Sequence, residues 1–156
     1  MTTRVTHEVE GTRHAGADFA ALLRPGDIVI LRGDLGAGKT AFTQGVARGL
    51  GCTQRVTSPT FTICQVYELP DGAIDALLHI DLYRIGHAAE LSDLGVDEAV
   101  DRGAVAMVEW GDLAPTGFGE PSWTVTLRGG DDDDREITIE PRDSARLAAA
   151  QTWASA

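Results

Sequence analysis

The chain has 156 residues, of which 43% are hydrophobic and 6% aromatic. We therefore expect a single domain over residues 1–156 that forms its core without disulfide bonds or a structural metal ion. Its formal net charge of −11 opposes contact with phosphate backbones and argues against direct binding of tRNA or DNA. No apolar run approaches the ~20 residues that cross a bilayer, and the N-terminal residues lack the apolar h-region of a signal peptide. Together with two cysteines that lack metal or redox spacing, these features favour a cytoplasmic protein without membrane contact.

The first half of the chain alternates between predicted strands and helices. Turn residues and apolar periodicity indicate an edge strand, a helix, a buried central strand and a second helix. These elements cover residues 3–10, 12–24, 27–31 and about 39–50. Pro25-Gly26 ends the first helix, and Gly49 and Gly51 can end the second.

The second half contains two predicted antiparallel hairpins. Residues 61–69 and 74–82 flank the turn Pro70-Asp71-Gly72, and residues 123–127 and 136–139 flank an acidic tip at 131–134. Between the hairpins we expect short helices and a buried strand, over residues 88–94, 97–102 and 104–110. The alanine-rich tail from about residue 143 is expected to be either helical or poorly ordered.

A glycine-rich loop between the buried strand and the second helix carries the strongest functional motif. Its sequence is Gly33-Asp34-Leu35-Gly36-Ala37-Gly38-Lys39-Thr40, which matches G-x-x-x-x-G-K-[ST] in full. Glycines let successive backbone N–H groups point at phosphate oxygens, and the following helix adds the positive end of its dipole. Lys39, the only lysine among 13 basic residues, would bridge the β- and γ-phosphates, and the Thr40 hydroxyl would bind Mg²⁺.

A hydrolase of this kind also needs an acidic residue at the end of a strand beside the loop. Asp81 ends the apolar run 77–81, and Glu109 ends the run 105–109. Either carboxylate can hold Mg²⁺ or orient the attacking water, and the sequence leaves the choice open. We expect Lys39, Asp81 and Glu109 to be the catalytic residues. His79 shares a strand face with Asp81, where a structural role is the commoner one.

Two further features bear on the reaction. Ser58 and Thr60 lie shortly after the predicted second helix, where hydroxyls can sense the γ-phosphate, although a plain Ser-Pro turn explains them equally well. The single lysine precludes an Asn-Lys-x-Asp guanine-recognition segment, so ATP is the favoured nucleotide. A small-molecule kinase is the first alternative, but the arginines are scattered and form no basic lid. A nucleotide-sensing module without turnover is the second.

These motifs together resemble the TsaE (YjeE) family, the ATPase of bacterial tRNA threonylcarbamoyladenosine (t6A) biosynthesis. The resemblance rests on the loop and on S-P-T-F at 58–61, H-I-D-L-Y-R at 79–84 and V-E-W at 108–110, and it covers roughly residues 27–111. It implies a three-layer α/β P-loop NTPase domain with a mixed parallel and antiparallel central sheet.

The resemblance also implies roles for individual residues and for partners. Thr40 and Glu109 would serve Mg²⁺, Asp81 would lie in the same site, and residues 58–61 would form a switch. The ATPase would be slow alone and would act with threonylcarbamoyl-transferase subunits of the TsaB/TsaD type. This chain departs from the family in a long turn at 68–76 and in the acidic tip at 131–134, neither of which is expected to touch a motif.

Overall fold

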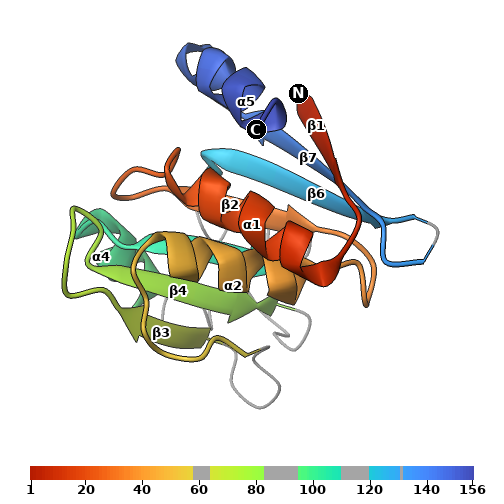
Figure 1. The fold of residues 1–156 in the computed structure, drawn as a ribbon. Helices are drawn as coiled ribbons and strands as arrows, with labels where there is room; N and C mark the ends of the chain where they lie inside the picture. The colour runs from red at the N-terminus through yellow and green to blue at the C-terminus, as the bar shows by residue number, and fades with distance from the viewer. Residues whose placement is uncertain (58–63, 83–94, 110–119, 131) are drawn as a thin grey trace.

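The computed structural model describes residues 1–57, 64–82, 95–109, 120–130 and 132–156. The strands of this part form one seven-stranded sheet in the order β1-β7-β6-β2-β5-β4-β3 (Figure 1). Their bounds are β1 Thr2–Thr6, β2 Ile28–Arg32, β3 Cys64–Glu68, β4 Ala76–Asp81, β5 Val105–Glu109, β6 Trp123–Gly129 and β7 Arg135–Pro141.

The four middle strands, β6, β2, β5 and β4, are parallel to one another, and antiparallel strands extend the sheet at both sides. This arrangement confirms the α/β class, the mixed sheet, both predicted hairpins and the central position of β2. The apolar runs of β2 and β5 are explained because parallel strands are covered on both faces.

Helices lie on both faces of the sheet and complete three layers. One face packs against α1 (Val9–Ala20), α2 (Lys39–Gly49) and α5 (Leu147–Ala154), and the other against α4 (Val96–Asp101). The predicted helix at 97–102 is therefore confirmed, whereas the one at 88–94 lies outside the described residues. Helix α1 begins three residues before its predicted start, and the predicted edge strand at 3–10 ends at Thr6. Both bounds were misplaced because residues 7–11 carry no apolar stripe that would mark the start of a helix. Within the described ranges, no helix is long and apolar enough to cross a membrane.

Helices α1 and α2 touch through glycines. A Cβ atom at Gly45 would lie 1.9 Å from the carbonyl oxygen of Arg13, and one at Gly16 would lie 2.2 Å from that of Phe42. Any larger side chain would push the helices apart. Exposed Glu10 adds ion pairs to Arg13 and Arg48, and hydrogen bonds from Arg48 and Arg13 lower the pKa of this carboxyl. The close contact fixes α2, and with it the end of the loop that precedes it.

The C-terminal tail is part of the core. After a 3-10 turn (Ser144–Arg146), helix α5 buries Trp153, whose indole Nε1 donates a hydrogen bond of 2.9 Å to the carbonyl oxygen of Ala15. Arg146 pairs with buried Asp27 at 2.7 Å, and its guanidinium lies 5.6 Å from the ring centre of Trp123. Figure 1 shows α5 beside β1, with the two termini near each other. Of the two expectations for the tail, the helical one is correct.

We predict that Trp153→Ala destabilises the protein by about 3–5 kcal/mol, because it removes a buried aromatic side chain and leaves the Ala15 carbonyl without its donor. Urea denaturation followed by far-UV circular dichroism measures this change. Gln151→Ala, at an exposed position of the same helix, is the control and should shift the midpoint little. Equal midpoints for the two variants would contradict the anchoring role of the tail.

Candidate functional site

The glycine-rich loop joins the end of β2 to the start of α2 and is shaped by residues with positive φ. Gly33 has φ 151° and Gly38, which precedes the first turn of α2, has φ 101°. Side chains rarely adopt such angles. A Cβ atom at Gly33 would also lie 2.6 Å from the carbonyl oxygen of Leu127 on β6. The loop can therefore pass close to β6 only because this position is glycine.

Lys39 opens α2 and is largely buried, with 8% of its surface exposed. Its Nζ atom donates a hydrogen bond of 2.6 Å to the carbonyl oxygen of Gly33 at the other end of the loop. The ammonium thus lies across the loop. Thr40, next in the helix, is half-buried, whereas Leu35 at the tip of the loop is 95% exposed.

The two predicted carboxylates are directly opposite one another at the ends of adjacent strands. Asp81 on β4 pairs in register with Glu109 on β5, and Glu109 pairs with Leu31 on β2, just before the loop. All three side chains share one sheet face. Both carboxylates and the loop line a cavity of about 280 Å³. Its lining residues are Val9, Thr12, Leu35, Gly36, Gly38, Lys39, Thr40, Ala41, Asp81, Glu109, Asp133 and Arg135. A larger groove of about 780 Å³ opens beside β3 and contains none of the predicted site residues.

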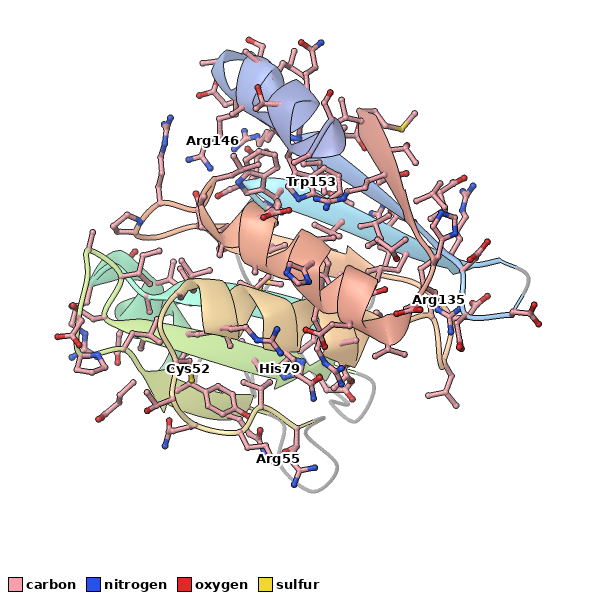
Figure 2. The ribbon with its side chains drawn as sticks, in the orientation of Figure 1. Cys52, Arg55, His79, Arg135, Arg146 and Trp153 are labelled. Carbon is pink, nitrogen blue, oxygen red and sulfur yellow. The ribbon has the colours of Figure 1, made fainter. Side chains whose placement is uncertain are left out.

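Glu109 is buried next to a buried histidine. Glu109 is 4% exposed and His79 is fully buried, and the Nε2 atom of His79 lies 3.5 Å from Oε1 of Glu109. Among the described residues, neither nitrogen of His79 nor Oε1 of Glu109 has a hydrogen-bond partner. Figure 2 shows His79 on β4, in the layer below α2. Unmet polar groups at such depth are rare in folded proteins and mark positions that stability alone does not explain.

The tip of the β6–β7 hairpin lies against the loop. Arg135 donates from Nη2 to the carbonyl oxygen of Gly36 at 3.4 Å and from Nη1 to that of Asp134 at 2.7 Å, and Asp133 lines the cavity. Figure 2 shows Arg135 at the start of β7, next to the turn of this hairpin and near the start of α1. The expectation that the acidic tip touches no motif is therefore wrong. Because β6 runs parallel to β2 and beside it, the hairpin emerges at the edge of the sheet where the loop lies.

Five lining residues were therefore missed by sequence reasoning, namely Val9, Thr12, Ala41, Asp133 and Arg135. The sequence contained a signal for one of them, because Arg135 is a basic residue directly after an acidic tip. Its relevance depends on the strand order, which no local pattern indicates.

Ser58 and Thr60 lie outside the described residues, so their role as a switch stays a prediction. The preceding segment is anchored to α2 and β3. The side chain of Gln44 on α2 donates to the carbonyl oxygen of Val56 at 2.9 Å, and the backbone N–H of Thr57 donates to the hydroxyl of Tyr67 on β3 at 3.4 Å.

The oxygen atoms in this cavity suit a hard divalent cation. Thr40, Asp81 and Glu109 offer a hydroxyl and two carboxylates, which are the ligands that Mg²⁺ prefers. No group of three or more His, Cys, Asp or Glu side chains in the described ranges is arranged to hold a metal by itself. This donor set fits an ion that takes its remaining ligands from a bound molecule and from water, as Mg²⁺ usually does.

Comparison with known proteins gives the family. A family model described as "Threonylcarbamoyl adenosine biosynthesis protein TsaE" matches residues 6–137. The chain belongs to the TsaE family. A Bacillus subtilis relative named tRNA threonylcarbamoyladenosine biosynthesis protein TsaE is 45% identical over 130 residues, covering 83% of this chain and 79% of the relative. A Treponema pallidum relative of the same name is 38% identical over 135 residues, covering 86% and 97%.

The fold agrees with this TsaE assignment. The crystal structure of Bacillus subtilis YdiB superposes with a TM-score of 0.79 at 34% identity, covering 98% of this chain and 93% of that one. The whole described architecture is thus shared with a solved structure.

We predict that replacing the buried carboxylate of Glu109 with a neutral amide stabilises the protein. Glu109→Gln should raise the free energy of unfolding by about 1 kcal/mol without ligands, because a neutral amide costs less free energy to bury than a carboxylate whose Oε1 atom has no hydrogen-bond partner among the described residues. Urea midpoints measured in EDTA test this, with Asp81→Asn, at a half-buried position, as the control that should change less. A Glu109→Gln protein less stable than wild type would contradict this description of the site.

Proposed function

We propose that this TsaE-family chain is a P-loop ATPase that binds and hydrolyses Mg·ATP and acts with partner subunits in the t6A modification of tRNA. One observation carries the proposal. A single cavity brings the loop residues Lys39 and Thr40 together with two strand-end carboxylates, Asp81 and Glu109. These four residues are the parts that phosphoryl transfer to water requires.

Phosphate binding would use the loop and the start of α2. Backbone N–H groups of the loop and the positive end of the helix dipole favour an anion here. Lys39 would exchange the carbonyl oxygen of Gly33, which its Nζ contacts at 2.6 Å, for phosphate oxygens. This exchange requires no large movement because the ammonium already lies across the loop. Arg135, which lines the same cavity and donates to the carbonyl oxygen of Gly36, would supply a second positive charge beside the loop.

The carboxylates would divide the remaining work. We assign Glu109, with Thr40, to the metal, and Asp81 to the attacking water. When bound, Mg²⁺ neutralises charge on the phosphate oxygens and orients them. Asp81 is half-buried and can accept a hydrogen bond from a water molecule in the cavity, which aligns that water for attack.

Partner subunits would carry the RNA. The net charge of −11 disfavours a phosphate-contacting role for this chain, and its relatives are named for tRNA threonylcarbamoyladenosine biosynthesis. We therefore infer that it works in the cytoplasm with threonylcarbamoyl-transferase subunits of the TsaB/TsaD type. Ser58 and Thr60 would change their contacts with these subunits when the γ-phosphate is present. An ATPase can drive a partner only if its ATP-bound and ADP-bound states present different surfaces.

We expect Lys39→Ala to weaken ATP binding and abolish turnover, since no other lysine exists in the chain. Lys39→Arg should also fail, because a planar guanidinium does not replace a compact ammonium in a closed loop. Phosphate release at saturating Mg·ATP is the measurement. Arg128→Ala, which removes an exposed cation of the β6–β7 hairpin, is the control and should retain activity. Wild-type turnover by either Lys39 variant would refute the ATPase assignment.

Partner dependence gives a further prediction. The purified chain should hydrolyse ATP slowly, and the rate should rise when the threonylcarbamoyl-transferase subunits are added. Ser58→Ala and Thr60→Ala should reduce this stimulation more than they reduce ATP affinity. The isolated chain should show negligible tRNA binding at physiological salt in a filter-binding assay. Salt-resistant tRNA binding, or full activity without partners, would contradict the proposal.

A further inference from the structure

His79 is a buried polar side chain next to Glu109 of the cavity, and the ATPase mechanism above does not use it. It is fully buried. Its neighbours in register are Gln65 on β3 and Met107 on β5. Strand alternation places it on the same sheet face as Asp81 and Glu109. The side chain is therefore directed into the layer between the sheet and α2. It lies two residues before Asp81 along β4, next to the two carboxylates on this face.

The described contacts of His79 point to Glu109 as its partner. The side-chain oxygen of Gln65 already accepts a hydrogen bond from the Tyr67 hydroxyl, and Met107 offers only a weak thioether acceptor. The Oε1 atom of Glu109 lies 3.5 Å from Nε2 of His79 and has no other hydrogen bond among the described residues. Two buried groups with unmet hydrogen-bonding capacity thus face one another across a gap slightly too long for a hydrogen bond.

At a separation of 3.5 Å, His79 and Glu109 lower the stability of the core. An unpaired buried nitrogen and an unpaired buried carboxylate oxygen each lose their hydration without full compensation. An apolar side chain of similar size at position 79 would remove that cost. The arrangement is explained if the hydrogen bond forms in another state of the site, when the position of the carboxylate matters.

We propose that His79 is a positioning residue for Glu109. Its Nε2–H donates to Oε1 when the Mg·nucleotide complex binds, which holds the carboxylate in the position from which it would serve the metal. Closing the gap from 3.5 Å to the ~2.8 Å of a charge-assisted hydrogen bond needs only a small rotation of either side chain. Carboxylates that ligate metals are commonly held in this way by a second group that does not touch the metal. This inference rests on the proposed function, because it takes Glu109 as a group that serves Mg²⁺.

The test compares a variant that removes the donor with one that restores it. His79→Leu has no hydrogen-bond donor, whereas the amide nitrogen of His79→Gln reaches a position similar to that of Nε2. The affinity for a fluorescent ATP analogue is measured for each protein in excess Mg²⁺ and in EDTA. His79→Leu should lose about 10- to 100-fold of the Mg²⁺-dependent tightening and retain its affinity in EDTA. His79→Gln should recover most of the loss.

Two further proteins separate positioning from a purely structural effect. Met107→Leu repacks the same layer beside His79 without changing a donor, and it should keep the wild-type response to Mg²⁺. In a Glu109→Gln background, adding His79→Leu should cause no further loss of tightening, because a residue that acts through Glu109 has nothing left to position. EDTA affinity and the urea midpoint confirm that each variant is folded.

The outcomes distinguish this inference from the proposed function. Wild-type tightening in Mg²⁺, lost in Glu109→Gln but kept in His79→Leu, would overturn the role of His79 alone. Additive losses in the double variant, or a glutamine variant as poor as the leucine one, would overturn it as well. If the wild-type chain showed no response to Mg²⁺, both the assignment of Glu109 and the role of His79 would fall.

Discussion

The parallel alignment of β6, β2, β5 and β4 is the constraint on which the site depends. The carboxyl ends of parallel strands meet at one edge of a sheet, so this order brings together four segments that are distant in sequence. They are the loop after β2, Glu109 at the end of β5, Asp81 at the end of β4 and the hairpin tip after β6. Helices on both faces stabilise the alignment, since parallel strands leave neither face to water.

One part of the domain provides its stability, and another part carries the candidate site. The body is tightly packed, with glycines that allow α1 to touch α2 and a C-terminal helix that buries Trp153. The edge that carries the cavity holds buried polar groups without partners, His79 and Glu109, among the described residues. The packed body offsets the cost of this edge, which is the usual relation between a scaffold and a pre-organised site.

Local patterns in the sequence were enough to predict the loop and the strands that position it. The glycine-rich motif, the apolar runs of β2 and β5 and the carboxylates that end β4 and β5 are all visible within ten or so residues. Features that depend on strand order were not predicted. Arg135 reaches Gly36 from 99 positions away, and Trp153 reaches Ala15 from 138 positions away. The glycine contact between α1 and α2 was missed for the same reason, because its steric requirement appears only when both helices are in place.

A crystal structure of the chain with Mg²⁺ and a non-hydrolysable ATP analogue tests the central claim most directly. The account predicts that the phosphates lie in the loop, that Nζ of Lys39 has left the carbonyl oxygen of Gly33 for phosphate oxygens, and that Thr40 and Glu109 face the metal. A nucleotide bound in the larger groove beside β3, or phosphates held without contact to Lys39, would contradict it.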